Sequence, residues 1–445
     1  MRTSIGYHTF TISKALTQED ADKLWKDIKR YRDTTGEIET VKREPYGKDP
    51  FARHYGIVYP YLYKGLSWEM RFSNRGFYIG GEFKPCSIKA TINPKVFTGE
   101  KSYITAADMS YIAEAESIFN QEAAKISPLL GRFGDYSLNR LDYCINFNVS
   151  ELNIKIPSHL SDELPKMIMR LIKRGDIPDH YHLENYKEEY EFYLKCGSTV
   201  INCYWKHIDL HNNFSDCPDL EESHDIIRFE IQHRYPKAYA VATKLKKKNE
   251  LQRTILMDKL REKGCFEFVE NDVERQKQDQ LYNGFAEVAQ IDTMRSILEG
   301  LTTDESCSEV IEKYFNDVIK PGDYFSFDTA KRILESKVNS WEKILRLTYA
   351  LERVRDYGSI ANAKIVLQGK ELAEFRRSLR ELGQLRINPV TIPSDWGIDY
   401  IPNLLNNYYK VLEKERLSAE AEKRNQQIFE DYIKDCRKQG KSWFS

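Results

Sequence analysis

The strongest constraint on the fold of this chain is the alternation of apolar and polar residues in two separate segments, 139–147 and 226–234. Successive residues of a β-strand point to opposite faces of a sheet, so this alternation predicts strands that bury one face only. The polar positions, expected together on one face, are Arg140, Asp142, Cys144, Arg228, Glu230 and Gln232. The apolar positions, expected to fill the core behind that face, are Leu141, Tyr143, Ile145, Phe147, Ile227, Phe229 and Ile231.

A third predicted strand, residues 198–208, lies between these two segments in the chain. Its alternate residues Asn202, Tyr204 and Lys206 are expected on one face, and His207 on the other. A helix is predicted over 162–174 from the spacing of its apolar residues. A charged strand face is often only solvated, but three strands that each carry a reactive group favour a shared polar face.

Strands and helices do not alternate strictly along the chain, which favours an α+β fold. A strand is predicted within residues 1–13, and short strands and loops within 34–104. We therefore expect a central, mostly antiparallel sheet with flanking helices, in a domain that spans residues 1–240.

From about residue 240 the pattern becomes helical and polar, which predicts a mainly helical region over 241–445 with DNA or partner contacts. Helices are predicted at 305–318, 329–356, 368–384 and, as a long charged helix, 403–438. Lys246, Lys247 and Lys248 belong to a basic stretch. They would either bind DNA phosphates or simply solvate a helix.

Composition limits the class of protein and its partners. The 445 residues have a net charge of −1, so a nucleic-acid partner would need a local basic patch rather than a global field. The eight cysteines form no CxxC pair and no zinc spacing, which is typical of reduced cytosolic thiols. No apolar run reaches the roughly 18 residues of a membrane span. We expect a cytoplasmic protein without membrane contact.

The reactive groups of the predicted polar face suit phosphodiester chemistry. Asp142 and Glu230 are hard oxygen donors of the kind that bind Mg²⁺ or Mn²⁺, which would polarise a phosphate. Tyr204 would attack phosphorus and form a 5′-phosphotyrosine that keeps the strand joinable. Lys206 would lower the phenol pKa, ordinarily about 10, or stabilise charge on the phosphate. An ordinary surface lysine is the alternative for Lys206.

Several other residues are weighed as auxiliary or rival groups. Arg140, Arg228 and His207 are auxiliary candidates, although packing or hydrogen bonding is the simpler role for His207. The triplet from His180 to His182 matches a His-hydrophobe-His metal motif, but it lies in a polar run close to Tyr204. Tyr193 is a rival nucleophile that lacks the Lys-His pair after it.

Four blocks in order carry a resemblance to a known family. They are Ile88-Lys89-Ala90 with Pro94-Lys95-Val96 and Gly99, then Asn139-Arg140-Leu141-Asp142, then Tyr204 to Leu210, then Arg228-Phe229-Glu230. The chain resembles the gene II proteins of filamentous phage, which are replication-initiating endonucleases, and more loosely the phage and plasmid initiators of rolling-circle replication. The resemblance covers about residues 55–240 well and 325–390 loosely, and 395–445 has no counterpart.

The resemblance implies a nicking-endonuclease-like sheet and a function in replication. Tyr204 aligns with the family's nucleophile, and the strand carboxylates would serve the metal. The origin would be nicked and the displaced strand rejoined, in the cytoplasm of a host bacterium. Implied partners are double-stranded origin DNA, the displaced single strand, and host helicase and polymerase. The alternatives are a non-catalytic origin-binding or regulatory DNA-binding protein, and a structural protein whose tyrosines are core aromatics.

Overall fold

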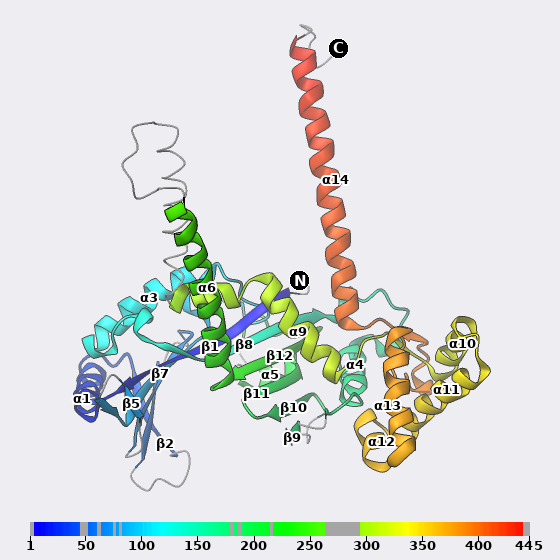
Figure 1. Ribbon diagram of the computed structural model, residues 1–445, viewed down its shortest axis with the longest axis horizontal. Helices are drawn as coiled ribbons and strands as arrows, with labels where there is room; N and C mark the ends of the chain where they lie inside the picture. The colour runs from blue at the N-terminus through cyan, green and yellow to red at the C-terminus, as the bar shows by residue number, and fades with distance from the viewer. Residues whose placement is uncertain are drawn as a thin grey trace. The chain divides into compact units, whose positions relative to one another are not determined.

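The computed structural model describes residues 4–44, 52–59, 64–73, 77–79, 82–100, 102–178, 181–185, 189–213, 217–262 and 294–438 (Figure 1). Contacts divide the chain into two units. The first unit comprises Met1–Asn146 and Ile177–Tyr314, and the second Phe147–Asp176 and Phe315–Ser445. This division differs from the predicted boundary at residue 240, because the chain leaves the first unit and returns to it.

A ten-stranded sheet forms the first unit, with the order β2-β3-β4-β7-β1-β8-β12-β11-β10-β9. The strands are β1 (Ser4–Leu16), β2 (Glu39–Arg43), β3 (Arg53–Val58), β4 (Leu66–Phe72), β7 (Cys86–Ile92), β8 (Ser137–Asn148), β9 (His182–Asn185), β10 (Glu191–Cys196), β11 (Thr199–Trp205) and β12 (Ile226–Arg234). A separate hairpin joins β5 (Phe77–Ile79) to β6 (Glu82–Lys84). The sheet is antiparallel and is accompanied by helices, so the predicted α+β class is confirmed.

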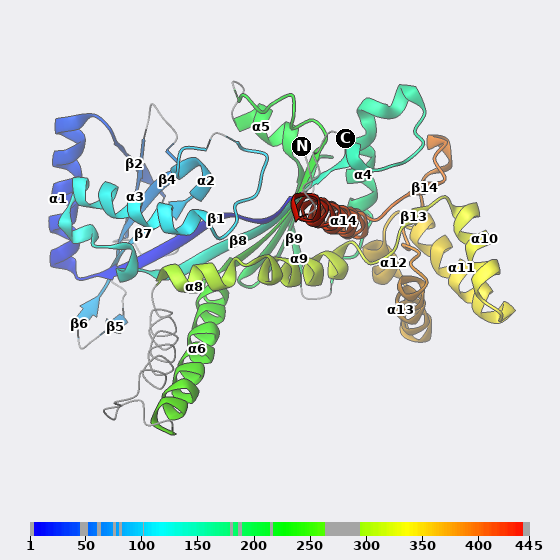
Figure 2. The ribbon, with the colours of Figure 1, turned by 90° about the horizontal axis from the view of Figure 1, so that it is seen from above.

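Helices flank this sheet in the first unit. They are α1 (Gln18–Thr35), α2 (Pro94–Phe97), α3 (Tyr111–Ile126), α5 (Lys206–Asn213), α6 (Lys237–Glu262) and α8 (Met294–Leu301). Short 3₁₀ turns at Pro128–Leu130 and Phe133–Asp135 lead into β8. In Figure 2, α8 lies on one side of β8 and α5 on the other.

The apolar face of the sheet forms the core, as the alternation predicts. Trp68 of β4 is 1% exposed, and its ring lies 5.1 Å from that of Phe119 on α3. Phe119 also contacts the rings of Phe133 and Tyr136 at 5.4 and 5.3 Å. The aromatic cluster fixes α3 against the sheet, so the opposite, polar face is the one left for function.

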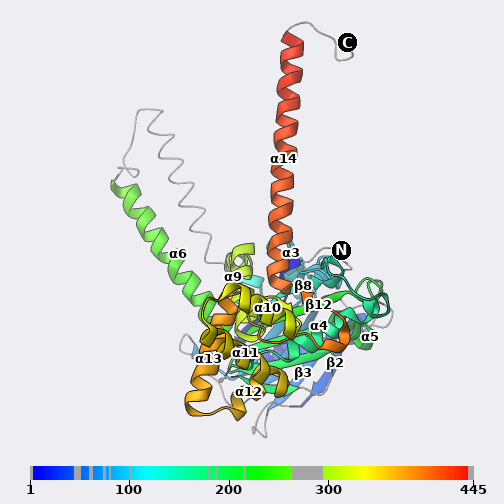
Figure 3. The same cartoon turned by 90° about the vertical axis from the view of Figure 1, so that its right-hand side faces the viewer.

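The second unit is mainly helical. Its elements are α4 (Leu164–Lys173), β13 (Tyr324–Phe325), α10 (Phe327–Lys337), α11 (Trp341–Asp356), α12 (Ile360–Val366), α13 (Gly369–Gln384), β14 (Tyr400–Ile401) and α14 (Leu404–Lys438), with 3₁₀ turns at Val149–Glu151, Ser158–Glu163 and Ser394–Trp396. Helix α9 (Asp304–Val318) runs across the division between the units. Figure 3 shows α10 to α13 gathered together.

Contacts within the second unit explain why contacts divide the chain differently from the predicted boundary. The Phe147 ring packs 5.5 Å from that of Phe315. The buried Asp176 carboxylate pairs with Lys320 and Lys364, each at 2.8 Å. These contacts join segments far apart in sequence, which a change of composition along the chain does not reveal.

Two predicted elements differ from those observed. The strand predicted over 198–208 ends at Trp205, and α5 begins at Lys206. The helix predicted over 329–356 is two helices, because the Ser340 side chain accepts a hydrogen bond from the Lys343 amide and starts α11 anew. Among the described residues, no helix has the length and apolar character needed to cross a membrane.

We expect the substitution Phe119→Ala to destabilise the chain by about 3–5 kcal/mol, because it removes a fully buried ring from the aromatic cluster. Denaturant unfolding of the full chain measures the change. Tyr239→Ala, at a site 49% exposed, is the matched control and should cost far less. Equal losses for both variants would contradict the assigned core.

Candidate active site

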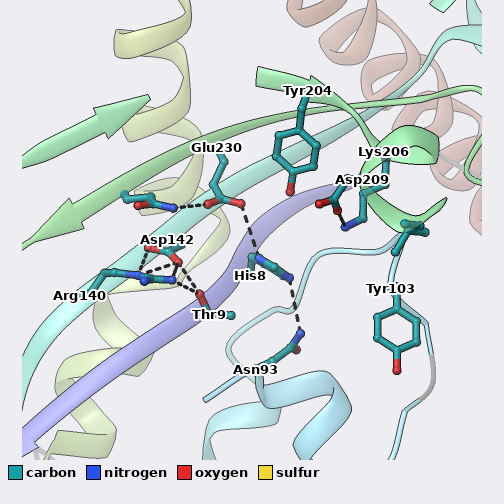
Figure 4. Close-up of a pocket in the computed structure, with 12 residues that line it drawn as sticks. His8, Thr9, Asn93, Tyr103, Arg140, Asp142, Tyr204, Lys206, Asp209 and Glu230 are labelled. Carbon is teal, nitrogen blue, oxygen red and sulfur yellow. Dashed lines mark hydrogen bonds and ion pairs between the residues drawn. The ribbon is translucent and has the colours of Figure 1, made fainter. Parts of the chain in front are cut away.

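The polar face of the sheet opens on a cavity of about 260 Å³ in the first unit (Figure 4). Strand register brings its walls together, since Asn202 lies opposite Glu230 and Tyr204 opposite Arg228. The lining residues are His8, Thr9, Asn93, Tyr103, Arg140, Asp142, Tyr204, Lys206, Asp209, Leu210, Glu230 and Gln232. The four principal residues singled out from the sequence, Asp142, Tyr204, Lys206 and Glu230, therefore share one cavity.

One wall carries an ion pair on β8 between a fully buried Asp142 and a half-buried Arg140. Arg140 and Asp142 lie two residues apart and so share a strand face. The Arg140 Nε donates to both Asp142 oxygens at 2.8 and 2.9 Å, and the Thr9 hydroxyl donates to the same carboxylate. Burial raises the pKa of Asp142 against the effect of Arg140, and the charge of Glu230 raises it further.

A β-bulge in β1 brings His8 and Thr9 to this wall. Tyr7 pairs with Tyr143 and Phe10 with Leu141, so two residues of β1 stand opposite the single residue Asp142. Sequence reasoning missed both residues, because strict alternation places only one of two consecutive side chains on the polar face. The sequence did contain a signal for the bulge, because His8 and Thr9 are consecutive polar residues within a predicted strand.

Glu230 is the second buried carboxylate. It accepts a hydrogen bond from Gln232 Nε2 at 2.8 Å, and its other oxygen lies 3.5 Å from His8 Nδ1. Burial opposes ionisation, but His8, Gln232 and the charge of Arg228 hold the pKa of Glu230 at about 2. Burial and the charge of Arg228 lower the pKa of His8 to about 4. At neutral pH an ionised Glu230 thus faces a neutral imidazole.

Tyr204 contributes a phenol directed into the cavity (Figure 4). Its side chain is 8% exposed, and burial raises the pKa of the phenol well above its ordinary value although the Arg228 charge opposes this. Arg228 is fully buried, donating to Asn146 Oδ1 at 2.6 Å and to the Tyr103 carbonyl at 3.2 Å. Its Nη1 finds no hydrogen-bond partner within the described ranges. A positive group therefore lies behind a protonated phenol.

Lys206 reaches the cavity by a different route from the predicted one. It is the first residue of α5 rather than a strand residue, and the turn into the helix keeps it beside Tyr204. Its Nζ lies 2.6 Å from Asp209 Oδ2 and 5.6 Å from the centre of the Tyr204 ring. Burial and the charge of Arg228 lower the pKa of Lys206 to about 8. Asp209, given no role from the sequence, thus holds the ammonium in place.

Other candidates from the sequence lie outside the cavity. His207 Nδ1 lies 2.9 Å from the Leu220 carbonyl oxygen, within a local hydrogen-bonding cluster. The Tyr193 hydroxyl accepts a hydrogen bond from Arg234 at 2.7 Å. The side chains of Lys246, Lys247 and Lys248 are exposed on α6. His182 lies on β9, whereas His180 lies outside the described residues.

The donor chemistry of the cavity fits a divalent cation. Asp142 and Glu230 offer the oxygens that Mg²⁺ and Mn²⁺ favour, and His8 adds an imidazole. Burial, and to a smaller extent the charge of Glu230, raise the pKa of Asp142, and a bound cation would oppose both effects. Within the described ranges no three such side chains already stand at metal-binding spacing, and Arg140 now faces Asp142. The metal assignment remains a prediction.

Comparisons with known proteins matched no family model, no curated protein and no solved structure. The site therefore stands on its own geometry: two phenols, three carboxylates, an imidazole and two cationic side chains line one cavity.

We expect His8 to titrate near pH 4 in the folded chain, as measured by NMR of its ring resonances with His8→Gln for assignment. Its folded pKa lies below the ordinary value of about 6.5, so the unfolded state binds the proton first as pH falls. His8 should therefore reduce stability as pH falls from about 6.5 to about 4. A midpoint near 6.5 would show that the imidazole is not enclosed in this wall.

Proposed function

We propose that this chain is a metal-dependent DNA-nicking and strand-joining enzyme that initiates rolling-circle replication. One observation carries the proposal: the Tyr204 phenol, the Lys206 amine and the carboxylates of Asp142 and Glu230 line the same cavity. A tyrosine nucleophile leaves a phosphate ester that can be rejoined, whereas attack by water would not.

The charges around the cavity suit an approaching phosphate. Arg140 and Lys206 are cations on its walls, and Arg228 lies behind Tyr204. Preorganised cations of this kind stabilise the charge that develops on phosphoryl oxygens. A divalent ion held by Asp142 and Glu230, with His8 beside them, would polarise the scissile phosphate.

Strand cleavage follows from the position of the phenol. The Tyr204 oxygen attacks phosphorus as the bond to the 3′ oxygen breaks, which leaves the 5′ end on the enzyme and a free 3′ hydroxyl as a primer. Arg228 and the Lys206 ammonium beside the ring favour the phenolate, and the proton that the phenol loses is matched by the one that the departing 3′ oxygen takes up. Joining is the reverse attack by a 3′ hydroxyl on the phosphotyrosine.

The proposed partners follow from this cycle. Origin DNA and its displaced single strand are the substrates, and a host helicase and polymerase in the bacterial cytoplasm would extend the primer. Lys246, Lys247 and Lys248 on α6 are proposed as exposed phosphate contacts away from the cavity.

We expect the full chain to nick a supercoiled origin plasmid with Mg²⁺ and to remain attached to the 5′ end. Tyr204→Phe should abolish the adduct, because it removes the only oxygen of that side chain. Chelation of the metal should abolish it as well, if Asp142 and Glu230 hold the ion. A gel shift of protein with labelled DNA after denaturation measures the adduct.

Tyr193→Phe is the matched control, since Tyr193 is also a sheet tyrosine but lies outside the cavity. It should form the adduct as the unaltered chain does. An adduct that persists in Tyr204→Phe, or disappears only in Tyr193→Phe, would reject the assignment. Origin binding without any adduct would favour the non-catalytic DNA-binding alternative.

We expect the single-turnover nicking rate to fall as pH rises through about 8, where Lys206 loses its proton. Lys206→Met should lower the rate about 10²- to 10³-fold at neutral pH, because it removes charge stabilisation from the phosphate. Lys206→Arg, whose guanidinium stays charged, should retain most of the rate and lose the decline above pH 8. A rate that rises through that pH, with Lys206→Arg inactive, would instead make Lys206 a base.

A further inference from the structure

The polar face of the sheet continues beyond the cavity across β1, β7 and β4 to β3 and β2. On the opposite face of these strands, Ile12, Ile88 and Met70 are completely buried. On the polar face, Ser13, Lys89 and Glu69 are only half-buried. This part of the sheet is therefore covered on one side and accessible on the other.

Strand register arranges the side chains of this face in three cross-strand rows. The first row consists of Arg140, Thr11, Thr91 and Ser67. The second row consists of Ser13, Lys89, Glu69 and Gly56. The third row consists of Ser87, Arg71, His54 and Arg43.

Cations run diagonally through these rows away from the cavity. Arg140 stands in the first row at the cavity wall, Lys89 in the second and Arg71 in the third. Lys89 and Arg71 are one strand and one row apart, which is about 8 Å in a regular sheet. We call Arg140, Lys89 and Arg71 the cation diagonal. It leads from the site of the proposed reaction along the open face.

Lys89 is the most informative member of the cation diagonal. No hydrogen bond or ion pair holds its ammonium among the residues that the structure describes. Burial lowers the pKa of Lys89, and the charges of Arg71 and Arg140 lower it further, while only Glu69 acts in the opposite direction. The Glu69 carboxylate is itself engaged by Arg43 at 2.9 Å. A bound anion would stabilise the charged form of this half-buried amine, which lies near two guanidinium groups.

The remaining side chains indicate which kind of anion fits. Hydroxyl groups and the carboxylate of Glu69, which Arg43 engages, occupy the spaces between the cations, and the Thr11 and Thr91 oxygens lie 3.1 Å apart. The three rows contain no phenylalanine, tyrosine or tryptophan on which a base could stack. Small donors and cations suit a phosphate backbone, whereas proteins that hold bases supply aromatic platforms.

We propose that the cation diagonal binds the backbone of single-stranded DNA and leads it toward the cavity. A single strand is flexible, so its phosphates can approach a half-buried lysine on the face of a sheet. A duplex is stiff and contacts side chains that protrude from the surface. This inference rests on the proposed nicking function for its direction, but the binding surface is tested independently of cleavage. The contact is with phosphate and sugar, so it should not depend on base sequence.

The test measures binding of a fluorescent oligothymidylate by anisotropy, with the metal chelated and in the Tyr204→Phe background so that no cleavage occurs. Lys89→Glu should weaken binding roughly tenfold at low salt, since each phosphate contact releases counterions. It should also reduce the slope of log affinity against log salt by about 0.7 per lost contact. Arg71→Glu should act in the same direction, and Lys89→Arg should retain binding.

Lys26→Glu is the matched charge-reversal control, because Lys26 is exposed on α1, which packs against the apolar face. It should leave oligothymidylate affinity unchanged. Lys89→Gln removes the charge without reversing it. Thermal unfolding of each variant shows whether weaker binding comes from a lost contact or from a loss of folding. Unchanged affinity in folded Lys89→Glu and Arg71→Glu, or an equal loss in Lys26→Glu, would overturn the proposal. With a labelled duplex measured in parallel, a loss of affinity for the duplex alone would overturn it as well.

The two proposals can fail separately. If the cation diagonal is wrong, Lys89→Glu binds the oligonucleotide normally while the unaltered chain still forms the Tyr204 adduct. If the nicking function is wrong, no adduct forms, yet binding of the oligonucleotide still depends on Lys89.

Discussion

The site depends on the hydrogen bonds and the charge of one buried guanidinium group, that of Arg228. Removing a charge from water is costly unless the surroundings replace its hydrogen bonds. Arg228 meets this need in part, because Nε donates to Asn146 on β8 and Nη2 to the Tyr103 carbonyl, while Nη1 has no hydrogen-bond partner among the described residues. Arg228 also lies opposite Tyr204 on β11. One side chain thus ties two central strands and a loop to the wall that holds the phenol.

The remaining charges of the cavity are ordered around this group. Arg228 helps to keep Glu230 ionised and His8 neutral, and it lowers the pKa of Lys206. Asp142 is balanced by Arg140, and Lys206 by Asp209. Acids and cations therefore alternate around a small space, which suits a dianionic transition state with a cation beside it better than it suits a neutral substrate.

Strand periodicity explains how much of this could be read from the sequence. Asp142 and Glu230 fall on polar positions of their strands, and register places them on the same wall as Tyr204. Lys206 was expected there for the wrong reason, since the chain has already turned into α5. His8 and Thr9 escaped prediction because a bulge, which depends on how β1 pairs with β8, breaks the alternation. The division by contacts differs from the predicted boundary at residue 240 because the second unit is built from two separated segments.

By itself, the sequence determined the class of fold and which face of each central strand would be polar. Both follow from local patterns, because side-chain direction in a strand repeats every two residues. The tertiary structure decided the order of the strands, the bulge at His8, the helix that carries Lys206 and the continuation of the polar face through Lys89 and Arg71. Those features depend on hydrogen bonds and packing between residues far apart in the chain, which no local pattern encodes.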